Sequence, residues 1–220
     1  IYKIGNPRYD RILNNLENVE YKLDLSLKDE GNILIFASMW DEDNKIIFEK
    51  FINSPLVNHF EKVIIVPHEV NDYYLNYYCS ILEDNDFSFK KINQYQNFNQ
   101  FDEEYIIINK VGFLSKLYAQ STIAYVGGGF SKSGIHNIIE PAAASNPVIF
   151  GSNFLNSNKS DAEGLIDVSG GFSVDSYELF SEKINWLLDK NNYNNSSKNC
   201  KSFVTENSGS TEKILKELYE

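Results

Sequence analysis

The chain has 220 residues, 42% of them hydrophobic, which is enough to bury a sizeable core in one large domain or two small ones. Its formal net charge of −11 argues against a nucleic-acid partner, because phosphate backbones are bound by clustered lysines and arginines. The two cysteines are far apart, and no apolar run approaches the roughly 20 residues that span a bilayer, so the sequence indicates a reduced, soluble domain.

Short apolar runs alternate with helical patterns along most of the chain. The predicted strands are Ile33–Ala37, Val63–Val66, Phe87–Ile92, Tyr105–Ile108, Ile123–Val126, Pro147–Phe150 and Phe172–Val174. The predicted helices are Lys45–Phe60, Asp72–Leu82, Phe113–Gln120, His136–Ala144, Tyr177–Leu188, Tyr193–Val204 and Thr211–Tyr219. This alternation is typical of an α/β fold, a doubly wound parallel sheet with helices on both faces.

The two ends of the chain differ from this central pattern. We interpret residues 1–30 as a connector and the start of a domain, residues 31–204 as the main domain, and residues 205–220 as a terminal helix. The polar composition of residues 191–199 suggests a mobile surface turn. Because the chain begins with Ile1 in mid-pattern, we expect it to be part of a longer protein.

Polar and glycine residues gather where the predicted strands end. Ser38, the triplet Pro67-His68-Glu69, Gly112 and the loop that begins at Gly127 all fall at the carboxyl ends of predicted strands. Ligands of doubly wound sheets bind beyond the carboxyl ends of the strands. The sequence therefore predicts one ligand site built from these four strand ends.

The loop Gly127-Gly128-Gly129, with Gly134 further on, is the most specific of these features. Glycines let the backbone approach a ligand closely, and a helix predicted from His136 would present free N–H groups to an anion. In isolation, three glycines only mark a tight turn. The loop has neither the lysine of a P-loop nor the spacing of a GxGxxG motif.

The polar residues after the loop admit a functional and a structural interpretation. Glu140 could accept hydrogen bonds from two ribose hydroxyls, or it could be a first-turn acid favoured by the helix dipole. His136 and Asn137 could bind phosphate or sugar oxygens, or Asn137 could cap the helix while His136 packs on the loop. His68 could contact a ligand or occupy a turn.

The remaining polar residues indicate structure. We assign the acids Asp41-Glu42-Asp43 to the capping of a helix, because acids favour the first turn, and His59 to a structural role. Three scattered histidines do not form a metal site, so we expect no metal ion and no cofactor.

Together these motifs resemble the bacterial Kdo transferases, which add 3-deoxy-D-manno-octulosonic acid (Kdo) to lipid A. The resemblance runs from about Gly5 to Val174. The matching segments are Gly5–Arg11, Ser38-Met39-Trp40, Pro67-His68-Glu69, Gly112-Phe113-Leu114, Gly127–Phe130, Gly134–Pro141 and Pro147–Gly151.

The resemblance implies the C-terminal, Rossmann-like half of a two-domain GT-B glycosyltransferase. In this family the N-terminal domain binds the lipid A precursor and supplies the catalytic base, and the C-terminal domain binds CMP-Kdo. It implies inverting, metal-independent transfer at the cytoplasmic side of the bacterial inner membrane, with no catalytic residue in this half. The donor-binding residues that it implies are Ser38, His68, Gly112, Leu114, Gly127, Gly128, Gly129, Gly134, His136, Asn137, Glu140 and Asp161.

The chain departs from the family pattern at three places. Ile135 stands where relatives have the second glycine of Gly-Gly-His-Asn, the arginine that many relatives carry beside Pro67 is missing, and Asp161 stands where a glutamate is expected. Two alternatives therefore stay open. The chain could be half of another GT-B enzyme with a UDP- or CDP-linked donor, or a non-catalytic nucleotide-binding module.

Overall fold

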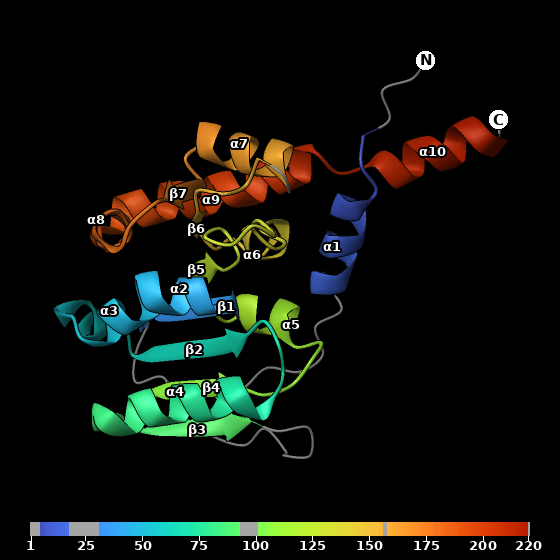
Figure 1. The fold of residues 1–220 in the computed structure, drawn as a ribbon. Coiled ribbons are helices and arrows are strands. Elements are labelled where there is room, and N and C mark those ends of the chain that lie inside the picture. The colour runs from blue at the N-terminus through green and yellow to red at the C-terminus, as the bar shows by residue number, and fades with distance from the viewer. Residues whose placement is uncertain (1–4, 18–30, 93–100, 156–157, 220) are drawn as a thin grey trace.

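A computed structural model describes residues 5–17, 31–92, 101–155 and 158–219. Within these ranges the chain forms one seven-stranded sheet with helices packed on both faces (Figure 1). The strands are β1 (Ile33–Met39), β2 (Lys62–Pro67), β3 (Phe89–Ile92), β4 (Tyr105–Ile108), β5 (Ile123–Val126), β6 (Val148–Gly151) and β7 (Gly171–Val174). The helices are α1 (Arg8–Glu17), α2 (Asp41–Asp43), α3 (Glu49–Ile52), α4 (Asp72–Asp84), α5 (Leu114–Tyr118), α6 (Ile139–Ala143), α7 (Lys159–Asp167), α8 (Tyr177–Leu187), α9 (Lys190–Glu206) and α10 (Ser210–Tyr219).

The sheet is parallel throughout, in the order β3-β4-β2-β1-β5-β6-β7. The chain builds one side of the sheet with β1 to β4, where β4 inserts between β2 and the edge strand β3, and then returns to build the other side outward from β5. The switch point therefore lies between β1 and β5, where ligands of such sheets bind. The predicted doubly wound fold is confirmed.

The central strand β1 is apolar along nearly its whole length because both faces of the sheet are covered. Leu34 and Phe36 belong to a core on one face, while Ile33, Ile35 and Ala37 belong to a core on the other. Successive side chains of a strand point to opposite faces, so one unbroken apolar run supplies both cores.

The helix predicted over Lys45–Phe60 is shorter and less regular than expected. After α2 the chain forms a π-helical turn, Asn44–Phe48, continues as α3 and stops at Ile52. A 3-10 helix begins at Pro55, and the Ser54 hydroxyl accepts its first free N–H. Proline lacks an N–H and disfavours helical backbone in the residue before it, so the α-helix ends ahead of Pro55.

The surface turn predicted for residues 191–199 is wrong, because these residues lie inside α9. The Asp189 carboxylate accepts hydrogen bonds from the N–H groups of Asn191 and Asn192 and so caps the helix. Cys200 and Val204 are buried on its inner face. Capping and packing thus outweigh the weak helix propensity of the asparagines.

The segment predicted as a connector contains α1, a helix that we did not predict, while residues 1–4 and 18–30 lie outside the described ranges. Tyr9 and Ile12 of α1 are buried in the core cluster that also contains residues of α6. Next to α1, α10 projects away from the sheet (Figure 1), held by Asp10, whose carboxylate accepts hydrogen bonds from the Thr211 N–H and hydroxyl. That α10 packs toward another domain stays a prediction.

None of the helices in the described ranges has both the length and the apolar character needed to cross a membrane.

Candidate functional site

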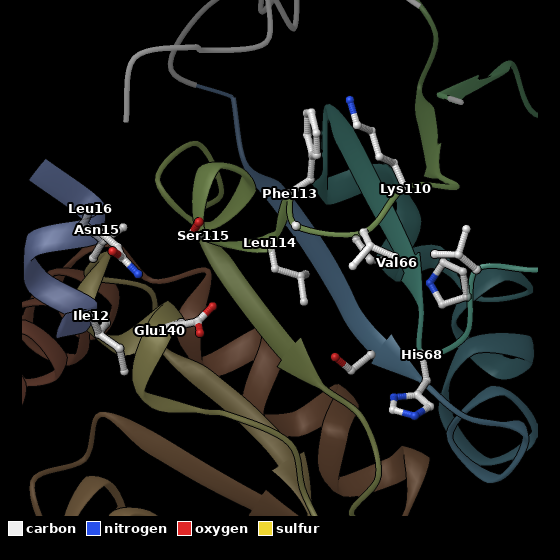
Figure 2. Close-up of a pocket in the computed structure, with 15 residues that line it drawn as sticks. Ile12, Asn15, Leu16, Val66, His68, Lys110, Phe113, Leu114, Ser115 and Glu140 are labelled. Carbon is white, nitrogen blue, oxygen red and sulfur yellow. The ribbon is translucent and has the colours of Figure 1, made fainter. Parts of the chain in front are cut away.

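The carboxyl edge of the sheet contains a cavity of about 340 Å³. Its walls come from the ends of β1 and β2, the loop that leads into α5, and one face of α1 (Figure 2). The lining residues are Ile12, Asn15, Leu16, Ser38, Val66, Pro67, His68, Val70, Lys110, Val111, Gly112, Phe113, Leu114, Ser115 and Glu140. Of the predicted site residues, the cavity brings together Ser38, His68, Gly112, Leu114 and Glu140.

The polar groups of the cavity come from different walls. Figure 2 shows the Glu140 carboxylate on the side of α1, directed toward Leu114, and His68 on the other side, at the end of β2. Lys110 lies on the wall before α5, with its ammonium group 4.4 Å from the centre of the Phe113 ring. The cavity therefore offers a carboxylate, an imidazole and a cation around an apolar floor.

Ser38 reaches the cavity because β1 is irregular at its end. The pairing of β1 with β2 shifts register between Ala37 and Met39, and Ser38 has a φ of +55°. A residue other than glycine in this left-handed region costs about 1–3 kcal/mol, which the surrounding packing must offset. The bulge turns Ser38 out of the strand pattern and toward the cavity.

The triglycine loop is buried, and its glycines allow its backbone to pack closely against other backbone segments. A Cβ on Gly127 would collide with the Ser38 carbonyl, one on Gly128 with the Gly134 carbonyl, and one on Gly129 with Gly151. The loop thus packs against the end of β1 and against β6. The donor-binding role of these four predicted glycines, Gly127, Gly128, Gly129 and Gly134, stays a prediction, since they are outside the cavity lining.

Asp43 is the residue that fixes this loop, and the sequence analysis assigned it only to helix capping. Its carboxylate is fully buried and accepts hydrogen bonds from the Tyr125 hydroxyl at 2.6 Å, the Gly128 N–H at 2.8 Å and the Trp40 N–H at 3.1 Å. Burial raises the pKa of Asp43, and these bonds partly oppose the rise. The Gly128 N–H is therefore satisfied inside the protein.

The helix after the loop begins at Ile139, so the predicted start at His136 is wrong. The side-chain oxygen of Asn137 accepts the Ile139 N–H at 3.1 Å, and this bond favours a turn ahead of the helix over an earlier start. Ile138, not Asn137, is the N-cap residue of α6, so Asn137 holds the turn ahead of the helix, and its donor-binding role stays a prediction. Its amide nitrogen also donates to a Glu140 carboxylate oxygen at 2.7 Å, which ties Asn137 to the cavity.

His136 and His68 lie in an aromatic stack with Trp40. The ring centres of Trp40 and His68 are 3.9 Å apart, those of His68 and His136 4.4 Å. The Trp40 indole N–H donates to Nε2 of His136 at 2.8 Å, so the neutral imidazole carries its proton on Nδ1. Burial lowers the pKa of both histidines, and the neighbouring His68 lowers that of His136 further.

Asp161 bonds residues at the start of α1, and it is not among the residues that line the cavity. Its carboxylate accepts a hydrogen bond from the Tyr9 hydroxyl at 2.7 Å and pairs with the Arg8 guanidinium at 3.3 Å. These contacts hold α1 against α7. A donor-binding role for Asp161 stays a prediction.

Several curated bacterial proteins match the chain over most of its length. A 3-deoxy-D-manno-octulosonic acid transferase of Rickettsia bellii is 27% identical over 225 residues, which are 97% of this chain and 50% of the relative. The corresponding transferase of Chlamydia trachomatis is 27% identical over 204 residues, 89% of this chain and 45% of the relative. The chain is homologous to Kdo transferases over most of its length.

The chain is also similar to a protein of Fusobacterium nucleatum that is named as a bifunctional glycosyltransferase/methyltransferase. It is 28% identical over 211 residues, 94% of this chain and 31% of that protein. The chain thus spans about a third to a half of the length of these curated relatives. No protein-family model matches it.

Solved structures show the same fold. The C-terminal CMP-Kdo binding domain of WaaA from Acinetobacter baumannii superposes with a TM-score of 0.65 at 16% identity, covering 91% of this chain and 95% of that domain. Anabaena HepE, in complex with UDP and glucose, has a TM-score of 0.53 at 11% identity, covering 97% of this chain and 52% of HepE. The Kdo transferase homologue has the fold of a GT-B C-terminal domain.

The sequence analysis missed three residues that organise the site. Arg8 lay in the segment interpreted as a connector, Trp40 in a strand-end motif, and Asp43 in an acidic run. The local signal was the position of Asp43 three residues after Trp40, since an acid at this spacing accepts a hydrogen bond from the backbone at the start of a helix. Nothing local indicated its bonds to Tyr125 and Gly128, which lie more than 80 positions away.

We predict that Asp43→Asn keeps the native stability at pH 7 within about 1 kcal/mol or raises it, whereas Asp43→Ala costs about 3 kcal/mol. Asparagine can still accept the two N–H groups and donate to the Tyr125 oxygen, but alanine removes the partner of the buried Tyr125 hydroxyl and Gly128 N–H and of the part-buried Trp40 N–H. Because the raised pKa favours the protonated carboxyl in the folded state, the native protein loses stability as pH rises from about 4 through that raised pKa.

This loss should be absent from the Asp43→Asn variant. Urea unfolding between pH 4 and pH 8 measures both effects. Equal stability of the alanine and asparagine variants would contradict the role of these bonds.

A second prediction concerns the tautomer of His136. Protonation of Nε2 would break the bond from Trp40, so Trp40→Phe, which preserves the stack, should raise the pKa of His136 toward its ordinary value. The native protein should lose stability as pH falls from about 6.5 through the lowered pKa values of His68 and His136. Imidazole ¹⁵N shifts recorded over pH 4.5–8 report both the tautomer and the titration. An unchanged His136 titration in Trp40→Phe would refute the effect.

Proposed function

We propose that this chain is the donor-binding half of a Kdo transferase and that it binds CMP-Kdo in the cavity at the carboxyl edge of the sheet. The observation that carries the proposal is the cavity itself. In a chain homologous to Kdo transferases, it gathers Ser38, His68 and Glu140 beside the switch point of the sheet. The fold shared with a domain described as CMP-Kdo binding supports the same ligand.

The cavity groups match the chemistry of a cytidine monophosphate sugar. The Glu140 carboxylate would accept hydrogen bonds from the ribose hydroxyls, and Lys110 would offer a positive charge to the donor's anionic groups. Ser38 and neutral His68 would donate hydrogen bonds to phosphate or sugar oxygens. The loop Gly112–Leu114 would bring backbone groups close to the base, because Gly112, at a φ of +85°, has open space beside it.

In the proposed reaction an acceptor hydroxyl attacks the anomeric carbon of Kdo, and CMP departs with inversion. No step of this scheme needs a metal ion, since the hydrogen-bond donors of the cavity would stabilise the charge on the departing phosphate. The base and the lipid A precursor site are expected on an N-terminal domain. The whole protein would then act at the cytoplasmic side of the bacterial inner membrane.

A second candidate is a glycosyltransferase half with another nucleotide donor. Two observations favour it: the Fusobacterium relative is named only as a glycosyltransferase with a methyltransferase, and Anabaena HepE was solved with UDP. Calorimetric titration with CMP, UMP, UDP and CDP separates the candidates. A preference for CMP supports the Kdo transferase, and a preference for a diphosphate supports the alternative.

We predict that Glu140→Ala weakens CMP binding by roughly ten- to a hundredfold, which corresponds to losing about 1.5–3 kcal/mol of charge-assisted hydrogen bonding. Calorimetry on the purified 220-residue chain measures the affinity. Glu83→Ala, an exposed acid on α4, is the matched control and should leave the affinity unchanged. Unchanged CMP affinity in a folded Glu140→Ala variant would remove Glu140 from the site.

We also predict that the 220-residue chain does not transfer Kdo, because the catalytic base is expected on the N-terminal domain. The assay is incubation with CMP-Kdo and a lipid A precursor, followed by mass spectrometry of the lipid, with an intact Kdo transferase as the positive control. Measurable turnover by these residues would contradict the prediction and place a base in this half.

A further inference from the structure

The side chain of Arg8 connects α1 to three polar residues. One guanidinium nitrogen donates to the Asn158 side-chain oxygen at 3.2 Å, and another donates to the Asn137 side-chain oxygen at 2.7 Å. The second nitrogen also lies 3.3 Å from the Asp161 carboxylate. The planar guanidinium presents its donors in a fixed fork, so these contacts define one geometry for the group.

Asn137 transmits this geometry to Glu140. Its side-chain oxygen accepts two hydrogen bonds, one from Arg8 and one from the Ile139 N–H. With the oxygen held on that side, the amide nitrogen must face the opposite way, where it donates to Glu140 at 2.7 Å. The orientation of the Asn137 amide therefore determines which of its groups faces the Glu140 carboxylate. In this orientation the NH₂ donor faces it, whereas the flipped amide would present an oxygen that repels it.

Arg8 is itself held in place. Asp161, 6% exposed, balances the guanidinium charge, and its other oxygen accepts the Tyr9 hydroxyl. Ile12, one turn further along α1, is buried and also lines the cavity. We call the series Arg8–Asn137–Glu140 the relay. Its cation, the Arg8 guanidinium, is thus held by an ion pair with Asp161, by the Tyr9 bond to that same carboxylate and by the packing of α1.

We propose that Arg8 is a positioning residue for donor binding, which acts through Asn137 to hold the Glu140 carboxylate toward the cavity. This inference rests on the proposed function, because it assigns Glu140 a contact with the donor. Helix α1 then contributes to the site in two ways. Ile12 and Leu16 form part of the cavity wall, and Arg8 orients Glu140 through Asn137.

The test is a double-mutant cycle on CMP affinity, measured by calorimetry with the 220-residue chain. Arg8→Lys keeps a cation near Asp161 but loses the fork that reaches both asparagines. It should weaken CMP binding about five- to twentyfold in the native background and less than about twofold in Glu140→Ala. Arg11→Lys is the matched control, since Arg11 is exposed on the same helix and is the only other arginine of the chain. It should leave the affinity unchanged.

A readout without ligand separates this inference from the proposed function. The side-chain amide signals of Asn137, assigned by their loss in Asn137→Asp, should show one proton shifted downfield by its bond to Glu140. Arg8→Lys should reduce that shift and Arg11→Lys should not. If Arg8→Lys does not fold, Asn137→Ala replaces it in the cycle, because it breaks the relay and leaves the Arg8–Asp161 pair in place.

The outcomes are distinct. If the native chain fails to bind CMP, the proposed function is refuted, and the donor role of Arg8 with it. This holds even if Arg8→Lys still reduces the downfield shift of the Asn137 amide proton. Unchanged Asn137 signals in Arg8→Lys refute the relay. Equal losses of CMP affinity in the native and Glu140→Ala backgrounds show that Arg8 acts on the fold and overturn the inference. Selective loss in the native background together with the amide change supports it.

Discussion

The buried carboxylate of Asp43 holds the end of β1 to the end of β5, at the switch point of the sheet. It bonds the Trp40 N–H just beyond β1, and the Tyr125 hydroxyl and Gly128 N–H at the end of β5. A carboxyl group withdrawn from water must be hydrogen-bonded, and this requirement fixes the Gly128 N–H of the triglycine loop against Asp43. Trp40 is placed by the same bonds, and it in turn orients His136 through its indole N–H. The geometry of the edge thus follows from one buried acid.

A second constraint comes from outside the sheet. Helix α1 precedes β1 in the chain, yet it packs against α6 and closes one side of the cavity. Its Arg8 pairs with Asp161 of α7 and bonds Asn137 before α6, so three segments far apart in the sequence meet at one guanidinium. Under the proposed role of Arg8, a shift of α1 would therefore change the orientation of the Glu140 carboxylate.

The electrostatics of the edge suit a ligand bound by hydrogen bonds more than by charge. The chain carries a formal net charge of −11, and the lowered pKa values of His68 and His136 keep both rings neutral at pH 7. Among the lining residues Lys110 is the cation and Glu140 the carboxylate. Under the proposed function, an anionic donor would meet neutral imidazoles and a hydroxyl, whose dipoles are positioned before the ligand arrives.

The local sequence was sufficient for the sheet, because the apolar runs such as Ile33–Ala37 are buried on both faces and their composition alone predicts strands. It was also sufficient to place Ser38, His68 and Gly112 at one edge, since parallel strands end on the same side, whereas Leu114 came from the resemblance to Kdo transferases and Glu140 from the helix predicted after the glycine loop. It was not sufficient for the start of α6, where an asparagine bond delays the helix, or for the purpose of the glycines, which is set by backbone segments from β1 and β6.

The roles of Asp43 and Arg8 were decided only in three dimensions. Each is an ionisable side chain whose partners lie far away in the chain, from 82 positions between Asp43 and Tyr125 to 153 between Arg8 and Asp161. Periodicity and spacing describe interactions within a few residues. They cannot reveal which distant groups will hydrogen-bond an ionisable side chain such as Asp43 or Arg8, and those bonds determine the geometry of this site.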